Sequence, residues 1–261
     1  MSAATLTDEH LERFDEDGFA IVEGLFSSDE CAEIVEEVER AQFELSLGEA
    51  ADGPLVYRPM MHLVSESLQA VATDRRWEPI VLPLVGDSYG ARLYWEQAVC
   101  KPPGARTELP WHQDNGYTPL IPEQYLTCWL ALDDATIDNG CIWVIPGSHL
   151  DGTKDHHNDP GGSPFRVGHE GASDLGIPVP VKAGDVLLFS SLIMHRSGPN
   201  TSDQDRRAWI LQYSGGQACS ALNEKLLDDR LLVAQSGVWL DEPVREREFD
   251  LLGVLANYDQ S

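Results

Sequence analysis

The amino-acid sequence predicts a mainly β fold with N-terminal helices, a double-stranded β-helix of the jelly-roll or cupin-like type. After about residue 90 the chain consists of short runs rich in β-branched and aromatic residues, separated by clusters of Gly, Pro and Asp. Asn139-Gly140 lies between two of these runs, and this dipeptide is a strong signal for a tight turn. Many short strands of this kind are typical of an antiparallel double sheet.

The first third of the chain is predicted to be largely helical. Residues 5–17 have the pattern of a short amphipathic helix that ends before a Gly, and residues 19–22 resemble a strand. A Ser and a Glu in the capping-box spacing open a longer helix over about 27–46, along which apolar residues recur at helical period. A third helix is expected to open near Pro59.

The β-type runs define the expected core: 92–101, 126–132, 141–145, 179–181, 186–190 and 208–213. A length of 261 residues is ordinary for one β-rich domain. We therefore expect a single domain over residues 1–261, with a helical part over about 1–90 and a jelly-roll core over about 91–261. The stretch from Leu150 to Pro178 lacks a periodic apolar pattern, and we expect it to act as a lid over the site.

The charge balance limits the classes of partner. The chain carries 18 basic and 44 acidic residues, which gives a formal net charge of −26. Such a surface repels nucleic-acid phosphates and anionic lipids. No apolar run approaches the roughly 18 residues that a membrane-spanning helix needs. We expect a small-molecule substrate, no nucleic-acid or membrane partner, and a monomer or small homo-oligomer.

Cysteine usage and the N-terminus indicate a compartment. The five cysteines are odd in number and no two have the C-x-x-C spacing, so neither a disulfide framework nor a zinc ribbon is predicted. The first ten residues are polar and acidic, unlike an export signal. These features favour a cytoplasmic protein.

A His and a carboxylate lie two residues apart in Pro110-Trp111-His112-Gln113-Asp114. On an extended strand this spacing puts both side chains on the same face, where a metal could take two neighbouring ligands. Two such ligands and one further His form the facial triad of non-haem Fe(II) oxygenases, which leaves coordination positions open. Such pairs also occur by chance at strand ends, so the motif alone does not establish a metal site.

The third ligand should come from a distant strand, and His195 follows the apolar run 186–194. Close by, Arg206 and Arg207 open the next apolar run. A buried Arg suits a 2-oxoglutarate enzyme, because the planar guanidinium can bind the distal carboxylate with two parallel hydrogen bonds. Adjacent strand residues face opposite sides, so only one of these two arginines can point inward.

Several blocks taken together resemble the phytanoyl-CoA dioxygenase family of Fe(II)- and 2-oxoglutarate-dependent oxygenases, in the family's order and with about its spacing. The blocks are Trp111-His112-Gln113-Asp114 with Tyr117; Cys128-Trp129-Leu130-Ala131; Asn139-Gly140-Cys141; Pro146-Gly147-Ser148-His149; and His195, Ser197, Pro199, Asn200 and Arg206. The segment from Leu6 to Phe26 is similar to the family's N-terminal helix and strand. The resemblance therefore spans most of the chain.

The resemblance implies a role for each matching position. His112, Asp114 and His195 would be the catalytic iron ligands. Arg206 would bind 2-oxoglutarate, and the positions Ser197 and Trp129 would line the cosubstrate pocket. The implied reaction uses Fe(II), 2-oxoglutarate and O2 to hydroxylate an unactivated carbon of a small metabolite, with succinate and CO2 as coproducts. Because Asp114 retains the carboxylate that halogenating relatives lack, hydroxylation or a related desaturation is expected.

Other interpretations stay open at the level of sequence. His156, His157 and His169 lie in a polar stretch, where a surface position is favoured, but they are the rival third ligands. A non-catalytic cupin-like binding protein would keep the fold without turnover, and a metal-dependent isomerase or hydrolase would need no Arg clamp. The large side chains in strand-like segments are candidates for the substrate pocket: Arg58, Arg92, Trp95 and Trp143.

Overall fold

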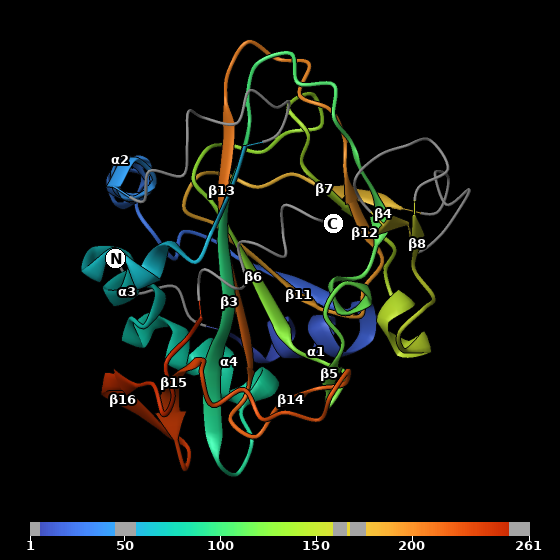
Figure 1. Ribbon diagram of the computed structural model, residues 1–261. Helices are drawn as coiled ribbons and strands as arrows, with labels where there is room; N and C mark the ends of the chain where they lie inside the picture. The colour runs from blue at the N-terminus through green and yellow to red at the C-terminus, as the bar shows by residue number, and fades with distance from the viewer. Residues whose placement is uncertain (1–5, 45–55, 159–165, 168–175, 251–261) are drawn as a thin grey trace.

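The computed structural model describes residues 6–44, 56–158, 166–167 and 176–250 (Figure 1). The helices are α1 (Asp8–Asp17), α2 (Ser28–Glu44), α3 (Glu66–Ala72) and α4 (Glu78–Val85). Short 3-10 helices are η1 (Met61–Leu63), η2 (Arg75–Trp77), η3 (Asp114–Gly116) and η4 (Ser148–Asp151). Of the stretch expected to form a lid, residues 159–165 and 168–175 lie outside the described residues.

The strands up to the middle of the chain are β1 (Phe19–Val22), β2 (Val56–Pro59), β3 (Gly90–Lys101), β4 (Leu109–His112), β5 (Leu120–Ile121), β6 (Leu126–Ala131), β7 (Ile142–Val144) and β8 (His157–Asn158). Those that follow are β9 (Arg166–Val167), β10 (Ile177–Val179), β11 (Val186–Ser190), β12 (His195–Ser197), β13 (Arg206–Gly215), β14 (Cys219–Ser220), β15 (Leu231–Gln235) and β16 (Val238–Val244).

Two antiparallel sheets form the body of the molecule. The major sheet has eight strands in the order β1-β11-β6-β13-β3-β15-β16, with β2 paired to β3. The minor sheet has four strands in the order β10-β7-β12-β4. Figure 1 shows the long strands β3 and β13 in the middle, with α2 and α3 on one side and β4, β7 and β12 on the other. This arrangement confirms the predicted jelly-roll class with accompanying helices.

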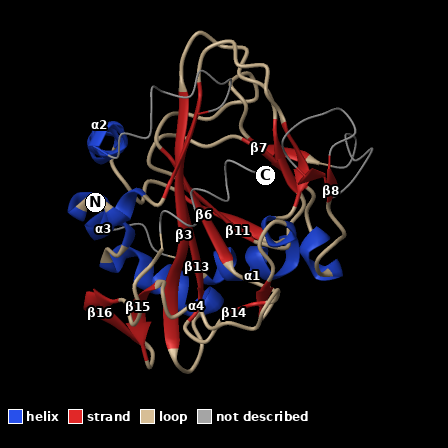
Figure 2. Ribbon diagram, viewed as in Figure 1, coloured by secondary structure: helices blue, strands red, loops and turns tan. Residues whose placement is uncertain are grey.

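The two faces of the major sheet carry different residues. On β13, Trp209, Leu211 and Tyr213 lie in the apolar core that also contains residues of α2, α3 and α4. Ala208 belongs instead to a second core with residues of the minor sheet, and Arg206 has the same strand parity. Because side chains alternate along a strand, one face of β13 supports the helices and the other faces the minor sheet. Figure 2 shows α2 and α3 beside these strands, on the side away from β7 and β8.

A buried polar contact joins the helical layer to the sheet. Glu96 is 0% exposed, and its Oε2 accepts a hydrogen bond from Trp209 Nε1 at 2.7 Å. Its Oε1 accepts from the backbone N–H of His62 at 2.8 Å and lies 3.1 Å from His62 Nδ1. A buried carboxylate is stable only when such donors replace water. This contact holds η1 against β3 and gives His62 a structural role.

Some sequence expectations for the elements were wrong. Residues 56–59 form strand β2, paired with β3, whereas the sequence suggested that a helix opens at Pro59. The helical pattern begins only at Met61, after a residue with positive φ at Met60. Pro59 fits the end of a strand because it needs no partner for the N–H that it lacks.

The Asn139-Gly140 turn has the expected backbone but joins strands that do not pair. Gly140 has φ of +87°, and a Cβ there would lie 2.6 Å from the carbonyl oxygen of Gly198. β6 before the turn belongs to the major sheet, whereas β7 after it belongs to the minor sheet. The turn therefore carries the chain between sheets.

No helix in the part of the chain that the structure describes is long and apolar enough to cross a membrane. All five cysteines are free thiols.

Candidate metal centre

Two neighbouring strands of the minor sheet bring the His and Asp side chains together. β4 ends at His112, Asp114 opens η3, and β12 begins at His195. The Cα atoms of His195 and His112 are register partners in the antiparallel β12–β4 pair. Directly opposite residues of such a pair point to the same face, so both imidazoles face the major sheet.

The three side chains converge closely. Asp114 Oδ1 lies 3.5 Å from His195 Nε2 and 3.8 Å from His112 Nε2, and the two imidazole centroids are 4.1 Å apart. One ligand atom of each residue lies within 4.8 Å of the others. Among the described residues this is the cluster of His, Cys, Asp and Glu that could hold a metal ion. Both imidazoles are 5% exposed, so solvent reaches them from one side.

Backbone carbonyls fix the orientation of both imidazoles. His112 Nδ1 lies 2.7 Å from the carbonyl oxygen of Pro110, and His195 Nδ1 lies 3.0 Å from that of Ile193. A carbonyl can only accept, so each Nδ1 carries the proton and each Nε2 presents its lone pair to the cluster. The aromatic ring of Phe189, 4.7 Å from that of His195, closes one side.

The two carboxylate oxygens of Asp114 have different neighbours. Oδ2 accepts hydrogen bonds from Thr127 Oγ1 at 2.7 Å and from Gln212 Nε2 at 2.9 Å. Thr127 on β6 and Gln212 on β13 are register partners on the inner face of the major sheet. Their two bonds anchor Oδ2, and Oδ1 is left directed at the two Nε2 atoms.

The electrostatics suit a divalent cation. Burial and then repulsion from His195 lower the pKa of His112, so this imidazole is neutral at pH 7. Burial opposes ionisation of Asp114, but attraction to His195 and the hydrogen bonds that it accepts hold its pKa below the usual value. The cluster therefore offers imidazole nitrogen and one carboxylate, a donor set typical of non-haem iron sites.

Arg206 lies buried on the same inner face. It is 2% exposed, its guanidinium lies 5.4 Å from the centroid of the Trp129 ring, and its Nε has no hydrogen-bond partner among the residues that the structure describes. Burial lowers its pKa to about 10, so it stays protonated at pH 7. A buried cation with an unsatisfied donor is costly unless an anion binds it.

Arg207 faces the other side, as strand alternation requires. It forms a bidentate ion pair with Asp133, with N–O distances of 2.7 and 2.8 Å. Its side chain is 33% exposed. Of the two adjacent arginines, Arg206 is therefore the one available to a ligand between the sheets.

Lys101 is a second buried cation that the sequence analysis missed. It is the register partner of Arg206 on β3 and is 0% exposed. Its Nζ donates to the carbonyl oxygens of Thr107, Ser197 and Gly198. Burial and then repulsion from Arg206 lower its pKa to about 7. The available signal was its place at the end of the predicted strand 92–101, at the same end as the metal motif.

The remaining predicted pocket residues lie near these cations. Ser197 is 3% exposed, two residues after His195 on β12, and its carbonyl oxygen accepts from Lys101. Trp129 on β6 lies under Arg206. The structure thus groups Ser197, Trp129 and Arg206, and their contact with a cosubstrate stays a prediction.

The rival histidines lie elsewhere. His156 Nε2 accepts from the backbone N–H of Gln113 at 2.8 Å, so it supports the strand end from outside. His157 begins β8, and His169 lies outside the described residues. His149 is buried against α1, where its Nε2 lies 3.2 Å from the carbonyl oxygen of Asp15. None of the three described histidines joins the metal cluster.

The other residues that the sequence suggested for the substrate pocket do not all lie on the same side of the sheets. Trp95 belongs to the inner side, where it lies in an apolar cluster with Tyr125. Trp143 points away from the metal and stacks with Arg196 at 4.6 Å. Arg92 is 0% exposed and bonds to the Gly216 carbonyl. Of these three, Trp95 lies on the inner face, and its contact with a substrate stays a prediction.

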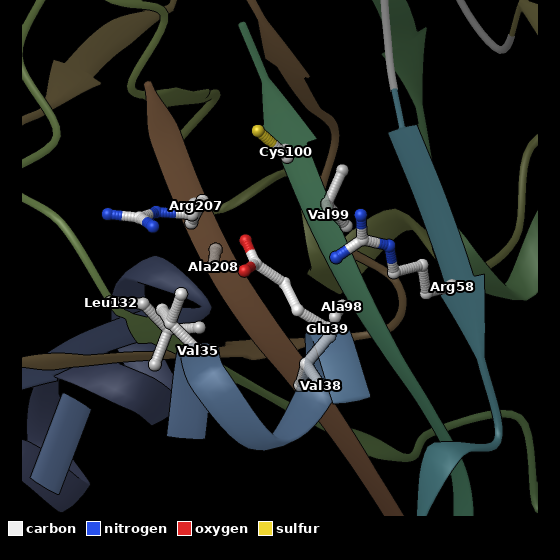
Figure 3. A pocket seen from close by; sticks show the side chains of 10 residues that line it. All are labelled: Val35, Val38, Glu39, Arg58, Ala98, Val99, Cys100, Leu132, Arg207 and Ala208. Atoms are coloured by element: carbon white, nitrogen blue, oxygen red, sulfur yellow. The ribbon is translucent and has the colours of Figure 1, made fainter. Parts of the chain in front are cut away.

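Arg58 lines a separate hollow, shown in Figure 3. This hollow lies between α2 and the ends of β2, β3 and β13, beside Glu39, Cys100 and Arg207. It has about 20 Å³ of room, which suffices for one or two water molecules. We assign it no role in the chemistry.

Comparison with known proteins identifies relatives. The sequence model of the phytanoyl-CoA dioxygenase family matches residues 14–208. Phytanoyl-CoA dioxygenase domain-containing protein 1 of Danio rerio is 28% identical, covering 78% of this chain and 88% of that protein. Methylphosphonate hydroxylase of Gimesia maris is 30% identical, covering 88% and 89%.

Solved structures of non-haem enzymes are also similar to this chain. The non-heme monooxygenase ThoJ in its apo form superposes with a TM-score of 0.71 and 25% identity, covering 95% of this chain and 93% of that chain. The epimerase SnoN, solved with Fe3+, alpha ketoglutarate and nogalamycin RO, superposes with a TM-score of 0.68 and 25% identity, covering 82% and 85%.

Proposed function

The chain belongs to the phytanoyl-CoA dioxygenase family, and from this premise we propose that it hydroxylates an unactivated carbon of a small-molecule metabolite. It is a non-haem iron oxygenase that uses 2-oxoglutarate as cosubstrate, and we propose succinate and CO2 as coproducts. One observation carries the proposal: two imidazole Nε2 atoms and one carboxylate oxygen converge on the inner face of the minor sheet.

We propose that His112, Asp114 and His195 hold the iron. The fit rests on the donor set, because both Nε2 lone pairs and Asp114 Oδ1 point to a common position. When bound, the iron and 2-oxoglutarate supply the oxygen-activating chemistry. The protein's part is to fix these three ligand atoms and to leave one side of the site open for cosubstrate and oxygen.

The distal carboxylate of 2-oxoglutarate is assigned to Arg206. Its unpartnered, buried Nε supports this assignment, because a carboxylate would satisfy the donor and neutralise the charge. Trp129 provides the flat wall below the guanidinium, and Ser197 lies beside Lys101, which bonds to its carbonyl oxygen. Lys101, as the register partner of Arg206, adds positive charge to the same end of the pocket.

The next proposal concerns the cellular compartment and the oligomeric state, and it is made from the composition of the chain. We propose one catalytic domain that works in the cytoplasm, as a monomer or small homo-oligomer, on small molecules and not on nucleic acid. Support comes from the net charge of −26 and from five free thiols.

The test is a metabolite panel incubated with the enzyme, Fe(II), 2-oxoglutarate and O2. Methylphosphonate belongs in the panel because a relative is named for its hydroxylation. Mass spectrometry should find one compound that gains one oxygen atom while stoichiometric succinate appears. A product that loses two hydrogens instead would indicate desaturation, and metal-dependent conversion without succinate would indicate an isomerase or hydrolase.

A further inference from the structure

Arg196 contacts two tryptophan rings on the outer face of the minor sheet. Its guanidinium carbon lies 4.6 Å from the centroid of the Trp143 ring and 5.4 Å from that of the Trp111 ring. Its Nε is buried and has no hydrogen-bond partner among the described residues. The cation–π contacts with the two rings are therefore the interactions that hold this guanidinium in place.

The three residues come from three neighbouring strands, directly behind the proposed iron ligands. Trp111 precedes His112 on β4. Arg196 follows His195 on β12, and its register partner on β7 is Trp143. Because side chains alternate along a strand, the imidazoles lie on the inner face of the sheet and these three side chains on the outer face. The cation–π contacts thus join β4, β12 and β7 at the level of the metal centre.

A β-bulge interrupts the pairing of β4 with β12 at the same level. Between the two register pairs of these strands, β12 has one residue, Arg196, whereas β4 has two, Pro110 and Trp111. Proline suits this position because a bulge leaves one residue outside the ladder of hydrogen bonds. The carbonyl oxygen of Pro110 lies 2.7 Å from His112 Nδ1 and fixes the orientation of that imidazole. The direction of His112 Nε2 therefore depends on the shape of the bulge.

The bulge lies in a strand with little other support. In the described part of the chain the minor sheet ends at β4, which has its one ladder with β12. An irregular ladder at a sheet edge leaves the backbone free to shift unless side chains restrain it. Arg196 supplies such a restraint, because its guanidinium contacts the Trp111 ring at the bulge and the Trp143 ring on β7, inside the sheet.

We propose that Arg196 is a positioning residue for the metal centre, which fixes the bulge of β4 and thereby directs His112 Nε2 at the ion. This inference rests on the proposed function of the three ligands. A role through charge alone has the opposite consequence for metal affinity. Removing a cation near the site would then strengthen the binding of a divalent metal ion, because like charges repel. Removing a restraint on a ligand weakens that binding.

The test uses the full chain and Co(II), whose visible absorption reports the geometry of its ligands. Arg196→Met removes the guanidinium and keeps a long side chain, and Trp143→Leu removes the ring on β7. Arg76→Met is the control, because Arg76 also lies over an aromatic ring, that of Phe26 at 4.0 Å, but in the helical layer. A competitive chelator titration measures the Co(II) affinity, and urea titration measures the unfolding midpoint of the metal-free protein.

We expect the Co(II) affinity to fall roughly 10- to 100-fold in Arg196→Met, with a changed visible spectrum. Trp143→Leu should also weaken binding, and the double variant should bind no more weakly than the weaker single variant, because both changes release the same bulge. Arg76→Met should keep the affinity and spectrum of the parent even where its unfolding midpoint falls. An unchanged or higher affinity in Arg196→Met would overturn the proposal, as would additive losses in the double variant.

Failure of the proposed function would give a different result. His112→Ala should lose most of the Co(II) affinity, because it removes a proposed ligand. If His112→Ala binds Co(II) as tightly as the parent, the ion does not lie at the proposed centre, and the assignment of the ligands fails whatever Arg196→Met does.

Discussion

Single residues on the major sheet set the geometry of ligands on the minor sheet. Thr127 and Gln212 together restrain one oxygen of Asp114, and the backbone carbonyls of Pro110 and Ile193 restrain the two imidazoles. Mutation of a group that holds a metal ligand in place typically lowers metal affinity roughly 10- to 100-fold. The pattern His-x-Asp predicts two of the proposed ligands, but nothing in the sequence marks Thr127 or Gln212, because their role depends on strand register.

Thr127→Val should weaken metal binding while leaving the three ligands present. The change removes the donor to Asp114 Oδ2 with little change in shape, so the carboxylate gains freedom to rotate. We expect Fe(II) or Zn(II) affinity to fall roughly 10- to 100-fold in a competitive chelator titration. Thr201→Val, which removes an exposed hydroxyl that bonds to the Asp138 carbonyl and to no proposed ligand, is the control. Equal affinities in both variants would show that Thr127 does not position the ligand.

Arg206→Ala should nearly abolish 2-oxoglutarate binding, whereas Arg207→Ala should leave it intact. Truncating one partner of a buried, hydrogen-bonded charge pair costs on the order of 2 to 5 kcal/mol. Arg207 already pairs with Asp133 on the outer face. Calorimetry with Zn(II)-loaded protein measures both affinities. The reverse order would mean that the guanidinium of Arg207, and not that of Arg206, meets the cosubstrate.

Binding of 2-oxoglutarate should take up a proton at Lys101. Without ligand, burial and Arg206 hold the pKa of Lys101 at about 7. A bound dianion nearby raises that pKa, so affinity is full below pH 7 and falls as pH rises from 7 towards the bound value. Calorimetry at pH 8 in two buffers of different ionisation enthalpy should detect uptake that disappears in Lys101→Met. Proton release, or uptake that persists in the variant, would contradict this.

At the scale of elements, the hydrophobic pattern predicts that a strand exists better than it predicts which strand it pairs with. The long apolar runs at β3, β6, β11 and β13 were found because they are buried on both faces. β14 and β16 were not, because a two-residue strand and a largely exposed strand resemble loops, and the short apolar run of β15 was missed although it is buried. Alternation required one of two adjacent arginines to face inward, and only the observed register and the family resemblance select Arg206. Lys101 was missed because burial of a single Lys depends on contacts with distant carbonyls.

The link between η1 and the major sheet should be a main source of stability in the helical layer. Glu96→Gln places an NH2 group against either the Trp209 N–H or the His62 N–H, so one buried donor loses its acceptor. The free energy of unfolding should fall by about 1 to 3 kcal/mol in urea titrations. Glu242→Gln on exposed β16 serves as the control. An unchanged unfolding midpoint would show that water replaces the lost acceptor.

At the scale of the whole molecule, the two sheets contribute different parts of the site. The minor sheet supplies His112 and His195, η3 at the end of β4 supplies Asp114, and the major sheet supplies both buried cations and the side chains that hold Asp114. α2, α3 and α4 pack on the outer face of the major sheet and contribute no ligand to the cluster. The fold class was predictable from the strand pattern, and the clustering of His112, Asp114 and His195 from the His-x-Asp spacing together with the family resemblance. The depth of the pocket and its positive charge were not predictable, because both depend on how distant strands pack together.

The most direct test of the central claim is succinate formation from 2-oxoglutarate by the purified protein, measured with and without Fe(II) and O2. The parent should form succinate only when both are present. His112→Ala, Asp114→Ala and His195→Ala should each abolish the activity while retaining the fold, and His157→Ala should not. An Asp114→Ala variant that binds iron and forms succinate like the parent would contradict the account.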